Sequence, residues 1–257
     1  MSSSSLRVTA SAMHSFKSKI EVLANNLANT QTVGFKRTAV NFSDGFYSYL
    51  QAPSVGGNPI GVAKGRGVNI SSTTHEMKQG SFRITENPLD WSINGKGFFR
   101  IVDQQGNIAY TRNGSFKTDE TGRLVTSAGW ALDPTITITQ DQQFSHISED
   151  GTVWVKQAGS TVLQNLGRIN ISIFPNPAGL EAIGNSMYLE TSASGAQQAA
   201  PPKTTGYGSV IGGTVESSNV QIVNEMVDLI GSQRAFDSNS KVIVAESNLD
   251  SPDKLIK

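Results

Sequence analysis

Residues 6–29 read LRVTASAMHSFKSKIEVLANNLAN and contain a regular pattern of apolar side chains. One set of side chains recurs every seven residues: Leu6, Met13, Ile20 and Leu27. A second set lies three residues after the first three of these: Thr9, Phe16 and Leu23. In a helix these two positions of each heptad form a continuous, mainly apolar stripe. The stretch therefore predicts an amphipathic helix, and Gly34 is expected to provide the turn that follows it.

A second heptad pattern occupies residues 219–249, near the other end of the chain. One set of side chains again recurs every seven residues: Ile222, Leu229, Phe236 and Ile243. A second set lies four residues after the first three of these: Met226, Gln233 and Ser240. An isolated helix with one apolar stripe is only marginally stable in water. We therefore expect the terminal helices to form a coiled coil, either with each other in one subunit or also with neighbouring subunits.

The charges of the two ends support contact between them. Residues 1–36 hold four bases and one acid, a net charge of +3, whereas residues 212–257 hold four bases and seven acids, a net charge of −3. The effect is small, because an exposed ion pair contributes only about 0–1 kcal/mol.

The middle of the chain, residues 80–211, has the pattern of a β structure. Short β-type segments alternate with turns such as Asn94-Gly95 and Asn113-Gly114. Strands are expected at residues 89–93, 97–102, 108–112, 115–117, 123–126, 135–139, 152–156, 168–174 and 187–191. Their close spacing favours a sandwich or a rolled sheet. Prolines and glycines in residues 46–68 favour an extended loop or an irregular hairpin, and residues 192–208 favour a loop.

These patterns predict an α+β fold, with paired N- and C-terminal coiled-coil-forming helices and a central antiparallel β-rich domain. The expected helical domain comprises residues 1–36 with 212–257. Residues 37–75 are expected to form an extended linker or insertion, and residues 76–211 the β-rich domain.

Composition argues against several classes of function. The 257 residues include no cysteine, which excludes a disulfide framework and a Cys-ligated metal site. The 21 basic and 21 acidic residues balance, so nothing indicates a nucleic-acid partner. The N-terminus lacks the pattern of a secretory signal, and no run approaches the roughly 20 apolar residues that span a bilayer. Direct membrane insertion is therefore not expected.

The sequence contains no motif that indicates an enzyme or a cofactor. The three histidines, His14, His75 and His146, share no metal-ligand spacing, and the glycine-rich residues 61–67 lack the ending of a phosphate-binding loop. A pair of glycosidase carboxylates stays open, because its members can lie far apart in the chain. The aromatic pairs Phe98-Phe99 and Tyr47/Tyr49 are either binding platforms or, as is more usual, parts of a β core or a subunit contact.

Several ordered segments resemble the bacterial flagellar rod and hook axial protein family. They read ANNLAN at residues 24–29, GFKR at 34–37, NGKGFF at 94–99, YTRNGSF at 110–116, GRLV at 122–125, GTVESSNV at 213–220 and QRAF at 233–236. Their order along residues 6–245 makes the resemblance more specific than any single motif. Three features favour the distal-rod members: the length, residues 179–191, and the Pro/Gly-rich residues 50–66, where that group has an insertion associated with rod stiffness. Residues 248–254 depart from the usual ending of the family.

The resemblance implies a non-enzymatic subunit of a helical polymer, with the terminal helices forming the inner layers of a tube. The expected partners are further copies of the chain, other flagellar rod and hook proteins, and the surrounding basal-body rings. The expected location is the basal body across the periplasm, reached by flagellar export without a cleaved signal. The alternatives are a proximal rod or hook protein, or a secreted β-rich glycan-binding or hydrolytic protein.

The residues expected to carry assembly fall into two groups. The interface group follows the two heptad stripes: Leu6, Met13, Phe16, Ile20, Leu23, Leu27, Ile222, Met226, Leu229, Phe236 and Ile243. The second group is expected to fix the helix end and the exit of the chain: Asn25, Asn26, Asn29, Gly34 and Phe35.

Overall fold

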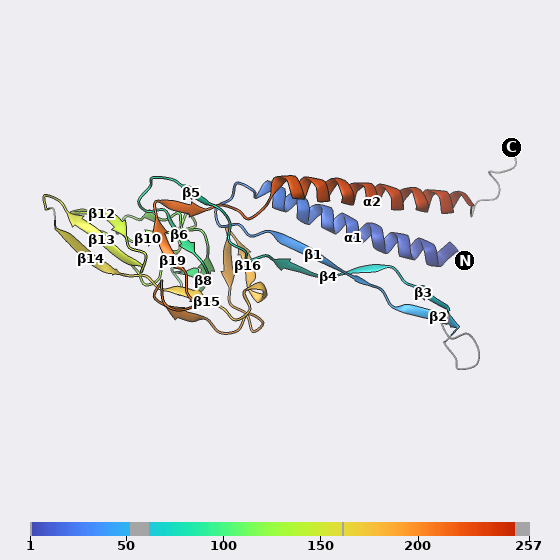
Figure 1. The fold of residues 1–257 in the computed structure, drawn as a ribbon, viewed down its shortest axis with the longest axis horizontal. Coiled ribbons are helices and arrows are strands. Elements are labelled where there is room, and N and C mark those ends of the chain that lie inside the picture. The colour runs from blue at the N-terminus through green and yellow to red at the C-terminus, as the bar shows by residue number, and fades with distance from the viewer. Residues whose placement is uncertain (1, 52–61, 161, 250–257) are drawn as a thin grey trace. The chain divides into compact units, whose positions relative to one another are not determined.

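The computed structural model describes residues 2–51, 62–160 and 162–249 (Figure 1). The chain divides into two compact units. The first comprises Met1–Ala28, Thr38–His75 and Gln221–Lys257, and the second comprises Asn29–Arg37 and Glu76–Val220. The segment expected as a linker, residues 37–75, thus falls almost wholly within the first unit, and residues 29–36 and 212–220 fall within the second.

Two long helices dominate the first unit. Helix α1 spans Ser2–Ala28, and helix α2 spans Ile222–Leu249. They lie side by side and run antiparallel (Figure 1), because Ser5 bonds to Glu246 at one end and Asn26 bonds to Glu225 at the other. Both expected helices are therefore present. Helix α1 begins earlier than its periodicity predicts, because the serines before Leu6 continue the helix.

A long β hairpin completes the first unit. Strand β1 (Thr38–Asp44) pairs antiparallel with β4 (Val68–His75), and β2 (Tyr47–Gln51) pairs with β3 (Val62–Gly65). The hairpin packs on α1, where the Phe16 and Phe42 ring centroids are 6.0 Å apart. Of the extended loop or irregular hairpin expected at residues 46–68, the described part forms the β2–β3 pair, which contains a register shift. Residues 52–61, which include most of the expected insertion, lie outside the described residues.

The second unit is built from antiparallel strands. Its largest sheet has the order β16-β17-β8-β7-β11-β10-β9, with β15 also pairing with β7 and β18 with β15. The bounds are β7 Phe98–Val102, β8 Ile108–Thr111, β9 Lys117–Thr118, β10 Leu124–Val125, β11 Ala131–Leu132, β15 Ile171–Ile173, β16 Glu181–Gly184, β17 Met187–Leu189 and β18 Gln198–Ala200. The expected central β-rich, antiparallel region is therefore confirmed.

Smaller sheets complete this unit. They are β12-β13-β14, β6 with β19, and β5 with β20. The bounds are β5 Phe82–Ile84, β6 Trp91–Asn94, β12 Gln142–Ile147, β13 Thr152–Gln157, β14 Leu163–Arg168, β19 Ser209–Gly212 and β20 Thr214–Glu216, and a short 3-10 helix spans Pro177–Gly179. The expected strand at residues 135–139 is absent: only an isolated bridge joins Thr137 to Arg123, although Ile136 is buried.

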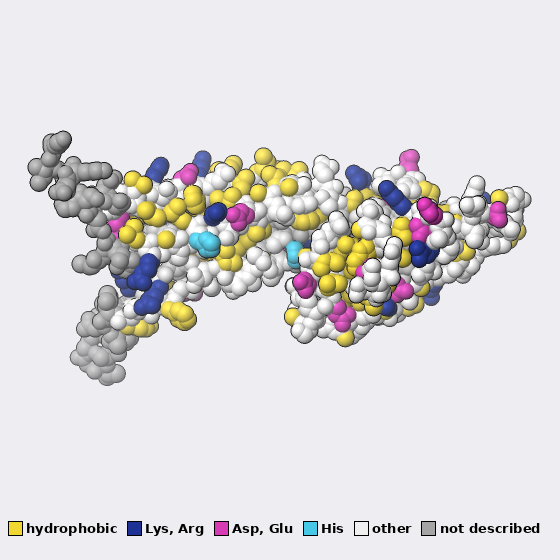
Figure 2. Space-filling view, turned by 180° about the vertical axis from the view of Figure 1, so that it is seen from behind, with side chains coloured by type: hydrophobic (Ala, Val, Ile, Leu, Met, Phe, Trp, Pro, Cys, Tyr) yellow, Lys and Arg dark blue, Asp and Glu magenta, His cyan; other side chains and the backbone are white. Residues whose placement is uncertain are grey.

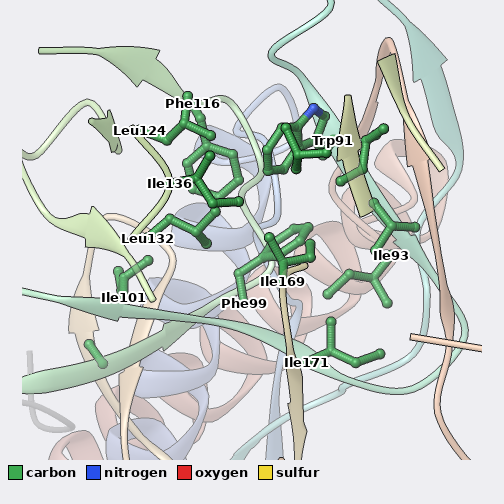
Figure 3. Close-up of a cluster of buried hydrophobic side chains, with 14 of the residues drawn as sticks. Trp91, Ile93, Phe99, Ile101, Phe116, Leu124, Leu132, Ile136, Ile169 and Ile171 are labelled. Carbon is green, nitrogen blue, oxygen red and sulfur yellow. The ribbon is translucent and has the colours of Figure 1, made fainter. Parts of the chain in front are cut away.

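The core of the second unit lies on both faces of β7. Side chains alternate across a strand, so Phe99 and Ile101 join Trp91 and Phe116 in one apolar cluster (Figure 3). Phe98 points the other way, into a smaller aromatic cluster with Tyr110, Phe174, Leu180 and Tyr188. The pair Phe98-Phe99 is thus part of a β core, which is the more usual of the two roles expected for it.

Candidate assembly interface

The expected interface residues of α1 are turned inward. Leu23 is buried, and the others are partly buried: Leu6, Met13, Phe16, Ile20 and Leu27. Helix α1 lies between α2 and the hairpin, so both neighbours contribute to this burial. Its heptad stripe is therefore covered within the unit.

The expected residues of α2 divide between two sides of the helix. Leu229, Phe236 and Ile243 are partly buried, whereas Ile222 and Met226 are 47% and 49% exposed. The inward positions between the apolar ones carry polar side chains at heptad spacing: Glu225, Ser232, Asn239 and Glu246. Glu225 and Ser232 are almost fully buried. The less apolar side of α2 is thus the side covered within the unit.

Two hydrogen bonds join the described parts of the two helices near their ends. Asn26 Nδ2 donates to Glu225 Oε2 at 3.1 Å near one end, and Ser5 bonds to Glu246 near the other. Thr9, Ser232 and Asn239 instead donate to backbone carbonyl oxygens one turn earlier in their own helices, at 2.7–2.9 Å. These polar groups are thus satisfied within their own helices, and these bonds do not join α1 to α2.

A continuous apolar surface on α2 faces away from α1. We define the α2 outer face by five exposed residues: Ile222, Val223, Met226, Val227 and Ile230. Between 47% and 73% of each of these residues is exposed. Figure 2 shows hydrophobic side chains gathered over the helices. An exposed cluster of this kind is typical of a protein interaction site.

Asn26 is the member of the helix-end motif that ties down the first unit. Its amide donates to Thr38 O at 2.8 Å and accepts from Thr38 N at 2.9 Å, so it pairs with that residue as a neighbouring strand would. Asn26 is fully buried, whereas Asn25 is exposed. The side chain therefore holds the start of β1 against the end of α1.

Asn29, Gly34 and Phe35, the last three members of the motif, lie in the second unit. Asn29 Oδ1 accepts a 3.0 Å hydrogen bond from Thr32, and Phe35 is partly buried. Gly34 has a φ of +69° and donates to Glu216 O at 2.8 Å. A Cβ atom at Gly34 would lie 2.6 Å from Asn113 N. Both the backbone conformation and the close approach thus require glycine there.

Sequence reasoning missed a buried ionic cluster in the second unit. Glu216 Oε1 lies 2.5 Å from Lys36 Nζ and accepts from Gly80 N at 2.9 Å, and Glu216 Oε2 lies 3.2 Å from Arg112 Nη1. Lys36 Nζ also donates to Lys78 O at 2.7 Å, and Arg112 Nη2 donates to Gly95 O at 2.8 Å. The three charged side chains are at most 5% exposed. Burial lowers the pKa of Lys36 and of Arg112, and the Glu216 carboxylate opposes this shift.

This cluster brings together the motifs that are far apart in the chain. Lys36 comes from GFKR, Arg112 from YTRNGSF and Glu216 from GTVESSNV, while Gly95 of NGKGFF accepts from Arg112. Asn219 adds a further tie, since its Oδ1 accepts from Arg37 N at 2.7 Å and its Nδ2 donates to Glu76 O at 2.8 Å. The signal available in the sequence was a charged residue at the centre of each of three motifs.

The described residues form no candidate metal centre. Across residues 2–51, 62–160 and 162–249, no group of three His, Asp or Glu side chains could hold a metal ion. Among the described helices, none is long and apolar enough to cross a membrane. His146 stacks on Trp154 and His75 bonds to Thr38, so both have structural contacts.

Comparison with known proteins identifies the family. Residues 6–36 match the model "Flagella basal body rod protein", residues 92–155 match "Flagellar hook protein FlgE/F/G D1 domain", and residues 211–251 match "Flagellar basal body rod FlgEFG protein C-terminal". Over 244 residues the chain is 42% identical to the flagellar basal-body rod protein FlgG of Caulobacter vibrioides, covering 93% of each chain. It is 39% identical to FlgG of Borreliella burgdorferi over 251 residues, 95% of each chain.

The match to a hook protein is shorter. It reaches 34% identity over 122 residues of the flagellar hook protein FlgE of Salmonella typhimurium, which is 48% of this chain and 27% of that protein. The matches to rod proteins extend over nearly the whole chain, including both terminal helices. The chain therefore belongs to the flagellar rod and hook family, among its FlgG basal-body rod proteins, which are structural proteins and not enzymes.

Proposed function

We propose that this chain is a structural subunit of the distal rod of the flagellar basal body, where copies assemble into a helical tube. The tube transmits torque and forms part of the export channel. The α2 outer face is the observation that carries the proposal, because five adjacent apolar side chains remain exposed in the single subunit. Covering them with neighbouring subunits is favourable by about 25 cal/mol per Å² of apolar surface buried.

The heptad residues take different parts in this proposal. Leu23, Phe16 and Leu229 stabilise the pairing of α1 and α2 in one subunit, because they are buried or partly buried there. Ile222 and Met226 contact other subunits, because about half of each residue stays exposed. The contacts between subunits join different surfaces, and such contacts build an open helical polymer instead of a closed ring.

The proposed location is the basal body, with the rod crossing the periplasm and its subunits exported without a cleaved signal. Other rod and hook proteins adjoin the two ends of the tube, and the basal-body rings surround it. The coverage of the relatives favours the rod over the hook, because the FlgG matches span 93–95% of the chain, compared with 48% for the hook protein.

Electron microscopy of basal bodies from a strain that lacks this gene tests the proposal. We expect rods that stop short and carry no hook, and we expect the wild-type gene to restore both. Complete rods with hooks in the deletion strain would refute the assignment to the distal rod. Complete rods without hooks would instead indicate that the chain acts in the hook.

A further inference from the structure

Helix α2 has two sides that could pack against α1, and they share three residues: Leu229, Phe236 and Ile243. The first side is completed by Ile222, Met226, Gln233 and Ser240, and the second by Glu225, Ser232, Asn239 and Glu246. We call them the mixed side and the polar side of α2. They differ by a rotation of about 50° about the helix axis, half of the roughly 100° between successive residues.

The structure turns the polar side toward α1. All seven of its residues are buried or partly buried, whereas three residues of the mixed side, Ile222, Met226 and Gln233, are exposed. A helix usually covers its more apolar side, and a carboxylate is rarely buried unless it is paired. Burial of apolar surface alone would therefore favour the mixed side, so specific bonds must hold the polar side in place.

Near the start of α2, Asn26 of α1 provides one such bond. Its Nδ2 donates to Glu225 Oε2 at 3.1 Å, and both residues are at most 1% exposed. Asn26 is also bonded to the backbone of Thr38, as donor at 2.8 Å and as acceptor at 2.9 Å. Because an amide nitrogen has two hydrogens, one bonds to Thr38 O and the other remains for Glu225. Asn26 is thus a fixed donor that cannot turn to follow a rotation of α2.

Near the other end of α2, Ser5 of α1 bonds to Glu246. Glu225 and Glu246 are each the fourth residue from an end of α2, and they are 21 residues, or three heptads, apart. They therefore lie on one side of the helix. Ser232 and Asn239, between them, donate instead to carbonyl oxygens of α2 itself. Those two bonds fit either rotational position of α2, so the two glutamates carry the selection.

We propose that Glu225 and Glu246 are positioning residues that set the rotational position of α2 against α1. Without their bonds to Asn26 and Ser5, α2 turns by about 50°, so that its mixed side moves toward α1 and the two carboxylates reach water. Two packings of the same helix pair are then available to one chain, and the two bonds select between them. The inference concerns the single subunit and goes beyond the proposed function.

The consequence for the subunit is the exposure of apolar residues on α2. Ile222 and Met226 belong both to the mixed side and to the α2 outer face, and they are about half exposed. The rotation would cover them with α1 of the same chain. Buried polar pairs of this kind can exchange stability for one defined arrangement, since apolar contacts alone do not specify orientation. The two glutamates therefore keep these apolar side chains available to a partner.

Two adjacent residues can report the rotation, because the chain has no cysteine of its own. Ser232, on the polar side, is 3% exposed, and Gln233, on the mixed side, is exposed. Ser232→Cys and Gln233→Cys are made in separate full-length parent chains, and the rate of reaction with a maleimide is measured on the purified subunits. Because a buried thiol reacts only after local opening, Gln233→Cys should react at least about tenfold faster than Ser232→Cys.

The two bonds are removed by Glu225→Ala together with Glu246→Ala in each parent chain. We expect the order of the rates to reverse, so that Ser232→Cys becomes the faster. Glu225→Gln together with Glu246→Gln is the matched control, because it removes the same two charges but keeps oxygens that accept from Asn26 and Ser5. This control should keep the ratio of the parent chains. Circular dichroism checks that all of the chains have equal helix content.

Each result decides the inference. Reversal in the alanine variant and not in the glutamine variant supports it. An unchanged order in the alanine variant overturns it, because other contacts then hold α2. Equal rates for the two reporters, in the parent chains or in the alanine variant, also overturn it, because α2 would then hold neither side toward α1. Reversal in both variants overturns it too, because charge and not the hydrogen bonds would then set the rotation.

The labelling experiment is independent of the proposed function. It is made on single subunits and needs no rods, whereas the assignment to the distal rod is tested by microscopy of the deletion strain. Failure of either one therefore leaves the other standing.

Discussion

Replacing Glu216 with glutamine removes the only acidic side chain among the three charged residues of the buried cluster while preserving its size. In the wild type, Glu216 Oε1 lies 2.5 Å from Lys36 Nζ, and Oε2 lies 3.2 Å from Arg112 Nη1. After Glu216→Gln, two buried cations remain without an opposite charge. Breaking a buried ion pair by removing one partner costs about 3–5 kcal/mol, and we expect a loss of this size in the free energy of unfolding.

Tryptophan fluorescence during urea unfolding measures this loss in the second unit. All three tryptophans, Trp91, Trp130 and Trp154, lie in the second unit, as does the cluster. With a slope of about 2 kcal/mol per molar urea, the midpoint should fall by about 1.5–2.5 M. Glu149→Gln is a suitable control, because Glu149 is 65% exposed in its pair with Lys203, and it should leave the midpoint unchanged.

The asymmetry of the cluster provides a sharper comparison. Lys36→Met leaves one cation and one anion, since Glu216 keeps Arg112 and the backbone N–H of Gly80. It should therefore cost less than Glu216→Gln. A loss below about 1 kcal/mol for Glu216→Gln, or an equal loss for Lys36→Met, would refute the view that Glu216 neutralises buried charge.

The pH dependence of the same variant has a definite sign. Burial lowers the pKa of Lys36 in the folded chain below its ordinary value of 10.5. Between these two values the unfolded chain binds more protons, so this group makes the folded state more stable as the pH rises. Glu216→Gln removes the opposing carboxylate and widens this window. The difference in unfolding free energy between variant and wild type should therefore shrink as the pH approaches 10.5.

Three further predictions concern the backbone, the helices and a buried tyrosine. Gly34→Ala should destabilise the second unit by roughly 2–4 kcal/mol in the same urea titration. Gly106 also has a positive φ, but no atom lies near the methyl group that alanine would add, so Gly106→Ala should cost only about 1–2 kcal/mol. Val227→Asp should block entry into rods but leave the thermal unfolding curve, measured by circular dichroism, nearly unchanged. Leu23→Asp should instead unfold the helical pair, because it places a charge in a buried position. Equal effects of the two variants on unfolding would contradict the assignment of inner and outer faces. Burial raises the pKa of Tyr188 to about 12, so the folded chain keeps the hydroxyl proton to a higher pH than the unfolded chain does. The stability that this group contributes is therefore lost between about pH 10 and 12. Tyr188→Phe should reduce this alkaline loss by about 2–3 kcal/mol, and an unchanged dependence of stability on pH would count against a buried hydroxyl.

The helices and the class of the middle region could be predicted from the sequence because both depend on local patterns. A seven-residue period specifies a helix whatever it packs against, and turns such as Asn94-Gly95 separate strands without long-range information. Strands with little apolar periodicity were not predicted. Strand β14, LQNLGR, is held mainly by its pairing with β13, a contact that local patterns do not reveal.

Two terminal helices, an antiparallel β-rich middle and the resemblance to flagellar axial proteins all follow from the order of the residues along the chain. Which side of α2 is covered depends instead on how α2 packs against α1. The heptad of Leu229, Phe236 and Ile243 can be completed by either Met226 or Glu225. In the structure Glu225 is buried, where its carboxylate accepts a hydrogen bond from Asn26, and Met226 is exposed. It also brought Lys36 next to Glu216, 180 residues away. Such a contact depends on how distant segments pack, and no local pattern encodes it.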